Sequence, residues 1–277
     1  MADCGSNGWS IITSAQANSN VAGILAGFLF FGLVYLLGRS EKREEVVLLF
    51  TASFIVLAFA SFLFSRLSGF SVQSTLDPRA TADACKAAWM AGMIAIAMLV
   101  VGAATMVVGL GYVLVAYNAE SERRYLQRLA TATAVGVLAG TIFMLYTSTN
   151  FYEVLLDSPD KLLTWTFIVV AILMALLIAV ITYTSSRGSS RRERRDKYIE
   201  WSVYVIGGFG ISGAALTGIT ARIDPSYAVS WLVIAVSAGF PGVIVIMLAG
   251  GIVDGRDEKA RAKEKASPGS MGGLQRP

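Results

Sequence analysis

The hydrophobic and polar positions of this chain alternate in long blocks. Seven stretches contain no charged residue, and each is at least 20 residues long: 4–38, 46–65, 87–119, 129–152, 162–186, 201–221 and 225–253. About 20 helical residues, rising about 1.5 Å each, cross the hydrocarbon core of a bilayer, which is about 30 Å thick. The pattern therefore predicts an all-α integral membrane protein with seven transmembrane helices.

The polar segments at the two ends set the expected domain boundaries. The first stretch becomes strongly apolar only near Val21, so we expect an outer N-terminal tail over 1–19 and a seven-helix transmembrane bundle over 20–253. The segment 254–277 is charged at first and ends in Ser, Pro and Gly residues, a composition typical of partial disorder. With 55% hydrophobic residues, the chain leaves no room for a soluble catalytic domain.

Basic residues predict the orientation of the bundle. Eighteen of the 23 Lys and Arg residues follow the first, third or fifth span or lie in the C-terminal tail, and five lie on the other side. Because Lys and Arg in short loops stay cytoplasmic, we expect the N-terminus outside and the C-terminus in the cytoplasm. The compact loops and the composition rich in Ala, Gly and Arg favour a bacterial inner (plasma) membrane.

The chain has two cysteines, and this orientation puts both on the outer side. Cys4 lies in the N-terminal tail, and Cys85 lies just before the third span. In an oxidising exterior they could form one disulfide that ties the tail over the entrance of the third helix. The alternative is a pair of unrelated thiols, since the sequence does not fix the distance between their Cα atoms.

A proline interrupts the seventh predicted span. Pro241 lacks a backbone N–H and its ring clashes with the preceding turn, so we expect a kink near Ala238–Gly242. The kink is either permanent or a hinge, and carbonyl groups freed at membrane depth could complete a binding cavity. The candidate hinge or cavity residues are Gly239, Pro241, Gly242, Ser237 and Ser212.

Small residues four positions apart indicate where helices approach closely in lipid. Three pairs have this spacing: Gly23 and Gly27, Gly136 and Gly140, Ala214 and Gly218. They predict packing inside one bundle or, alternatively, a subunit interface in a homo-oligomer. Four tryptophans near predicted span ends are typical of an aromatic belt at the membrane surface: Trp89, Trp165, Trp201 and Trp231.

A basic segment precedes the sixth span on the cytoplasmic side. Five of its residues are candidates for contact with anionic lipids: Arg191, Arg192, Arg194, Arg195 and Lys197. Such clusters are attracted to anionic lipid headgroups at about 1 kcal/mol per residue. The expected partners are therefore membrane lipids, and the alternative is an acidic protein that docks on this segment.

The absence of ionisable residues from the spans excludes several function classes. Proton pumps and ion-coupled transporters carry ionisable groups at membrane depth, and these seven spans have none. The chain has no histidine, and 225–253 has no lysine for a retinal Schiff base of the microbial-rhodopsin type. No glycine loop for phosphate binding occurs. We expect no catalytic residue, cofactor, metal or nucleic-acid partner.

Three functions remain compatible with this sequence. The first is a non-catalytic oligomeric bundle that forms a pore or a channel-like structure. The second is an accessory or scaffold subunit of a larger membrane complex. The third is a seven-helix receptor or sensor for an apolar ligand. Solute flux, co-purifying subunits and a ligand-dependent gain in stability would distinguish them.

Overall fold

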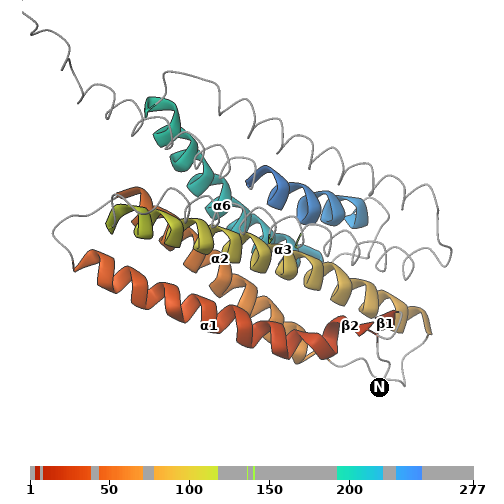
Figure 1. Ribbon diagram of the computed structural model, residues 1–277. Coiled ribbons are helices and arrows are strands. Elements are labelled where there is room, and N and C mark those ends of the chain that lie inside the picture. Colours follow the sequence, from red (N-terminus) through yellow and green to blue (C-terminus); the bar gives the residue numbers. More distant parts are fainter. Residues whose placement is uncertain are drawn as a thin grey trace, which may run out of the picture.

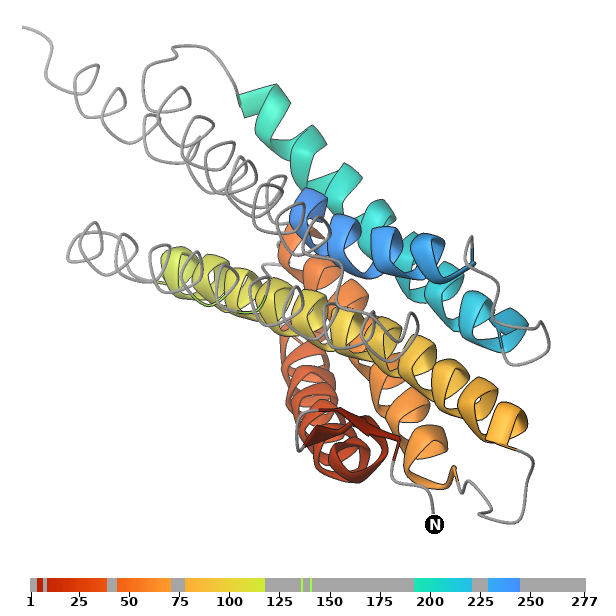
Figure 2. The same ribbon diagram turned by 90° about the vertical axis from the view of Figure 1, so that its right-hand side faces the viewer.

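The structure is a computed structural model that describes residues 4–6, 9–38, 44–70, 78–117, 136, 140, 192–220 and 229–244. A ribbon of two antiparallel strands opens the chain: β1 (Gly5–Ser6) and β2 (Trp9–Ser10). Four long helices follow: α1 (Ile11–Leu37), α2 (Glu44–Ser68), α3 (Pro78–Tyr117) and α6 (Arg192–Thr220). A shorter helix spans Val229–Ile244. Figure 1 shows these elements, and Figure 2 shows them from the side.

Four of the described helices are long and apolar enough to cross a membrane. These candidate spans are Ile11–Leu37, Val46–Ser68, Pro78–Leu110 and Glu200–Ile219. They correspond to the first, second, third and sixth predicted spans, and Val229–Ile244 lies within the seventh. The predicted spans 129–152 and 162–186 fall outside the described residues except for Gly136 and Gly140. The chain is therefore a helical membrane protein, and the full set of seven spans stays a prediction.

Helix α2 runs antiparallel to both α1 and α3. Ser19 of α1 lies beside Ser61 of α2, whereas Gly32, further along α1, lies beside Phe50. The opposite order of these partners fixes the antiparallel packing. Helix α2 lies between α1 and α3, and α6 packs on α2 and α3 (Figures 1 and 2).

Three helices begin well before the predicted spans that they contain. Helix α1 begins at Ile11, so the second half of the predicted tail 1–19 is helical. Helix α3 begins at Pro78, where proline suits the first helical position because its missing N–H needs no partner there. Helix α6 begins at Arg192, because the Arg, Lys and Glu residues that precede the apolar span are good helix formers.

The first turn of α1 has a local cause. The side chain of Ser10 accepts a hydrogen bond from the Thr13 backbone N–H at 3.4 Å, which caps the helix. Ile11 and Ala15 are fully buried, so this part of α1 packs in the core and is not a free tail. The hydrophobic pattern did not reveal this turn because its exposed residues are polar.

The main core is built mostly from α2 and α3, with residues from α1, α6 and Val229–Ile244, and large side chains occupy the space over glycines of α3. A Cβ atom built on Gly102 of α3 would lie 2.5 Å from Leu57 Cγ, and Cβ atoms on Gly92 and Gly109 would overlap Ile11 and Phe50. Small residues let helix backbones approach where the hydrophobic effect between helices is absent. We call these three glycines the α3 glycine row.

Serine hydroxyls join the helices at two further points. Ser53 Oγ of α2 donates to the Gly102 carbonyl of α3 at 2.6 Å, in a buried position. Ser19 Oγ donates to the Ser61 carbonyl, and Ser61 Oγ donates to the Ser19 carbonyl, both at 3.0 Å. These bonds satisfy hydroxyls that would otherwise be costly inside a bilayer.

Candidate functional site

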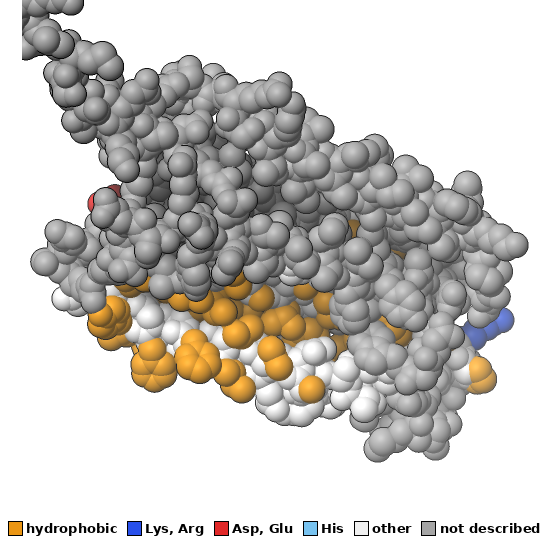
Figure 3. Space-filling view, viewed as in Figure 1, with side chains coloured by type: hydrophobic (Ala, Val, Ile, Leu, Met, Phe, Trp, Pro, Cys, Tyr) orange, Lys and Arg blue, Asp and Glu red, His pale blue; other side chains and the backbone are white. Residues whose placement is uncertain are grey.

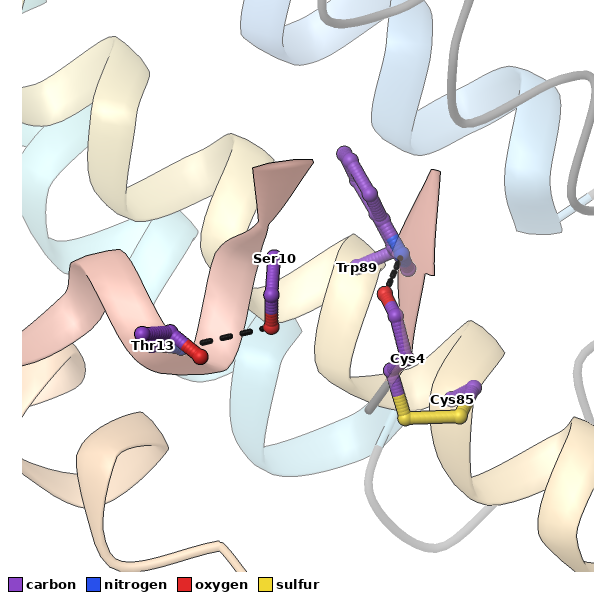
Figure 4. The surroundings of a disulfide bond; sticks show 5 residues. All are labelled: Cys4, Ser10, Thr13, Cys85 and Trp89. Carbon is purple, nitrogen blue, oxygen red and sulfur yellow. Dashed lines mark hydrogen bonds between the residues drawn. A yellow bond between two sulfur atoms is a disulfide. The ribbon is translucent and has the colours of Figure 1, made fainter. Parts of the chain in front are cut away.

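A disulfide joins the N-terminal ribbon to α3. Cys4 and Cys85 are bonded, with their Cα atoms 5.2 Å apart, and each residue is only 8% exposed. Ile12 and Ala84 pack around the two cysteines. The sequence left open a disulfide or two unrelated thiols. The structure has the disulfide, which ties the N-terminal segment over the entrance of the third helix. Figure 4 shows the bond beside the first turn of α1.

Trp89 holds the same segment through its indole nitrogen. Its Nε1–H donates to the Cys4 carbonyl oxygen at 2.9 Å, and its side chain is fully buried (Figure 4). The prediction that Trp89 belongs to an aromatic belt was therefore wrong, because the side chain is fully buried and the Cys4 carbonyl satisfies its polar atom. Trp201, in contrast, is 63% exposed, and Trp165 lies outside the described residues.

The sequence contains a signal for the ribbon that the charge pattern does not reveal. Asn7 and Gly8 stand between β1 and β2, and this dipeptide favours a tight hairpin connection. The pairing brings Gly5 opposite Ser10 and Ser6 opposite Trp9. The ribbon thus returns the chain from Cys4, beside α3, to the start of α1.

The five hinge or cavity candidates do not share one environment. Ser237, Pro241 and Gly242 are buried, whereas Gly239 and Ser212 are exposed. The hydroxyls of Ser237 and Ser212 donate to carbonyls of their own helices, those of Ile234 and Phe209, both at 3.3 Å. Helix Val229–Ile244 continues through Pro241, so a hinge there stays a prediction.

An aromatic contact connects the region of Pro241 to α6. The rings of Phe240 and Phe209 are stacked with their centroids 5.2 Å apart and 17° between their planes. Phe209 is fully buried, while Phe240 is 37% exposed. The stack is therefore part of the contact between α6 and the helix Val229–Ile244.

One side of α6 faces away from the part of the molecule that the structure describes. The residues along it are exposed and follow spacings of three and four positions: Trp201, Tyr204, Gly208, Ile211, Ala215 and Gly218. This is the spacing of a coiled-coil seam. Among the described residues, a Cβ atom built on Gly208 or Gly218 would meet nothing within 4 Å. We call this set of six residues the α6 seam.

The outward side of α1 has a different character. From Val21 onward it exposes many large apolar residues, among them Val21, Ile24, Phe28, Phe31, Val34 and Tyr35. We call them the α1 outer face, and Figure 3 shows hydrophobic side chains gathered over this part of the molecule. Phe31 is 72% exposed, more than any other large hydrophobic residue that the structure describes. Bulky apolar side chains of this kind suit contact with lipid.

The predicted glycine pairs are only partly used within the chain. Gly23 faces Ser61 and Gly140 faces Val100, but their partners Gly27 and Gly136 meet no atom within 4 Å of an added Cβ. Of the third pair, Ala214 is half-buried and Gly218 is exposed. The motif spacing thus missed the α3 glycine row, whose members are ten and seven positions apart.

The predicted lipid-contact residues extend α6 at its N-terminal end. Arg192, Arg194, Arg195 and Lys197 lie in its first turns, while Arg191 lies outside the described residues. The segment from Arg192 onward is thus helical and continuous with the sixth span. Its contact with anionic lipids stays a prediction.

The buried polar groups offer little chemistry. Within the described part of the chain, every buried polar side chain is a serine or a threonine. The same residues contain no group of three or more side chains suited to hold a metal ion. Hydroxyls that bond to neighbouring carbonyls position helices, and they carry no general base.

No protein-family model, curated protein or solved structure matches this chain.

Proposed function

We propose that this protein is a non-catalytic membrane protein that works as an oligomer, that its subunits meet along the α6 seam, and that the assembly forms a pore or channel-like bundle. The observation that carries the proposal is the contrast between the two outward surfaces. The α1 outer face carries large side chains, and the α6 seam carries glycine and alanine between larger residues. Small residues favour contact between helices in lipid, whereas bulky ones suit lipid contact.

The spacing of the α6 seam suits a second copy of the same helix. Positions three and four apart stay on one side of two helices that cross at about 20°. In a two-fold pair within a membrane, each residue faces its own copy near the axis. Gly208 and Ala215 would then allow close approach, while Trp201 and Ile211 would pack around them. The candidate span Glu200–Ile219 contains the whole seam.

The proposed orientation has the ribbon outside the cell. The distribution of Lys and Arg supports it, and so does the disulfide at that end, because disulfides persist in oxidising compartments. The test is a single cysteine at Gln16, an exposed residue of α1. A membrane-impermeant maleimide should label it in intact cells, and labelling only after lysis would reverse the orientation.

Cysteine cross-linking in native membranes tests the subunit contact. Both natural cysteines are in the disulfide, so an introduced cysteine is the chain's one free thiol. We expect Tyr204→Cys and Ala215→Cys to give a disulfide-linked dimer of twice 29.5 kDa on mild oxidation. The matched controls, Ile24→Cys and Phe31→Cys on the α1 outer face, should stay monomeric. Equal cross-linking from both surfaces, or none from α6, would exclude the seam as the subunit contact.

The mass of the particle then separates the function classes. Native mass spectrometry from nanodiscs should give a multiple of the single-chain mass, and solute flux from liposomes should accompany it. A particle with foreign subunits would instead favour the accessory or scaffold function. A monomer that gains stability with an apolar ligand would favour the receptor function.

A further inference from the structure

The N-terminal ribbon is fastened to α3 at two points that lie close together. The first is the disulfide between Cys4 and Cys85, and the second is the hydrogen bond from Trp89 Nε1 to the Cys4 carbonyl. The disulfide and the hydrogen bond therefore both act on Cys4, the residue just before β1: the disulfide through its side chain and the hydrogen bond through its backbone (Figure 4). Ile11, the first residue of α1, follows Cys4 by only seven positions.

This short connection leads into α1, the long helix that is least buried against the rest of the protein. In the most apolar 18 residues of α1 only 22% are buried, compared with 67% in the corresponding 18 residues of α3. Contact between α1 and α3 includes Ile11, whose side chain lies against Gly92 at the ribbon end of the bundle. The ribbon therefore fixes the end at which α1 reaches α3, while α2 supports the rest of α1.

Both fastenings are protected from solvent. Cys4 and Cys85 are each 8% exposed, and Trp89 is not exposed at all. Thiol–disulfide exchange requires a thiolate to reach one of the two sulfur atoms. Access therefore requires the ribbon to move first, and the Trp89 hydrogen bond opposes that movement.

We propose that the ribbon is a redox-sensitive lock that holds the outer end of α1 against α3, and that Trp89 controls how readily a dithiol opens it. This inference is independent of the proposed oligomer. Once the ribbon has moved, one thiolate of the dithiol attacks a sulfur of the Cys4–Cys85 bond and displaces the other as a thiolate. The second thiolate of the reductant then releases the mixed disulfide. Both cysteines end as thiols, and the dithiol leaves as its cyclic disulfide after giving two electrons.

The rate of reduction tests the control by Trp89. Full-length protein in nanodiscs is treated with dithiothreitol, quenched with iodoacetamide and analysed by mass spectrometry. Because the ribbon must open first, the rate should reach a plateau as the dithiothreitol concentration rises. Trp89→Phe keeps an aromatic ring but removes the N–H donor, so it should speed reduction about fivefold to tenfold. Phe62→Leu, at an exposed position of α2 outside both the ribbon and the α6 seam, is the control and should leave the rate unchanged.

Hydrogen exchange tests the effect on α1. Reduction should speed amide exchange in the first turns of α1 and leave the α2–α3 contact at the glycine row unchanged. The double variant Cys4→Ala with Cys85→Ala should reproduce this pattern without any reductant. The control by Trp89 would be overturned if the reduction rate rose in proportion to the dithiothreitol concentration and were the same in Trp89→Phe as in the unmodified protein. Unchanged exchange in α1 after complete reduction would overturn the lock.

Discussion

Helices α3 and α6 both carry several glycines, but the surroundings of these glycines differ. On α3, Cβ atoms built at the three positions of the glycine row would each run into a large side chain of α1 or α2. On α6, Gly210 and Gly213 face α2 and α3, whereas Gly208 and Gly218 meet nothing. The row on α3 is thus explained by packing within one chain. Within the described part of the chain the outward glycines of α6 have no such explanation, and the proposed subunit contact would supply one.

Replacing single glycines by alanine distinguishes glycines that pack against a neighbouring helix from glycines that face outward. We expect the largest effect from Gly102→Ala, because the new methyl group would lie 2.5 Å from Cγ of the fully buried Leu57. Overpacking costs about 1–3 kcal/mol, which exceeds the gain in helix propensity of about 1 kcal/mol at most. The midpoint of thermal denaturation in detergent should fall. An unchanged midpoint would show that Leu57 can move aside and that the α2–α3 contact is loosely packed.

A smaller loss is expected at Gly213, the inward glycine of α6. Its added methyl group would overlap Met98 Cε and lie 3.1 Å from Ile94 Cγ2. Because the end of a methionine side chain adapts readily, Gly213→Ala should cost less than Gly102→Ala in the same denaturation assay. A double-mutant cycle with Met98→Ala is the control, since the methyl group then enters vacated space and its cost should disappear. A cost that persists in that background would place the strain elsewhere.

The hydroxyl at position 53 tests whether the α3 glycine row depends on a polar contact as well. Ser53→Ala removes the buried 2.6 Å hydrogen bond to the Gly102 carbonyl. Such a bond inside a membrane contributes about 0.6 kcal/mol on average, so the midpoint should fall slightly. Thr51→Ala is the matched control, because Thr51 is exposed and its hydroxyl donates within α2 to the Val47 carbonyl. Equal losses from both variants would argue against a role for the contact between helices.

The sequence predicted the membrane class and most helix positions because charge is costly in a bilayer. The charge-free stretch 46–65 therefore lies within α2 and marks most of its length. The predicted helix starts were wrong at Ile11, where α1 begins among polar but uncharged residues, and at Pro78, where α3 begins in a charged segment. Helices continue beyond the bilayer wherever caps and good helix formers allow, and the absence of charge does not report on that.

The candidate sites were harder to predict from the sequence than the fold. The two cysteines were identified as potential partners because both lie on one side of the predicted membrane. Their pairing depends on a Cα separation of 5.2 Å, which arises from the ribbon and from the position of α3. Trp89 was assigned to the membrane surface because its position near a span end gave no sign that its side chain is buried. The α3 glycine row escaped detection because its spacing follows the partner side chains and not a four-residue motif.

The smallest effect, and the one that decides between packing and an outside partner, is expected at Gly208. In a detergent that keeps the chain monomeric, Gly208→Ala should leave the denaturation midpoint unchanged or raise it, since the methyl group meets nothing within 4 Å and alanine favours helix by up to about 1 kcal/mol. In nanodiscs the same variant should weaken cross-linking through Ala215→Cys, because a methyl group at the point of closest approach separates two copies of α6. Loss of stability in the monomer would mean that Gly208 packs within the chain. Unchanged cross-linking would place the subunit contact away from Gly208 and would mean that this glycine faces lipid.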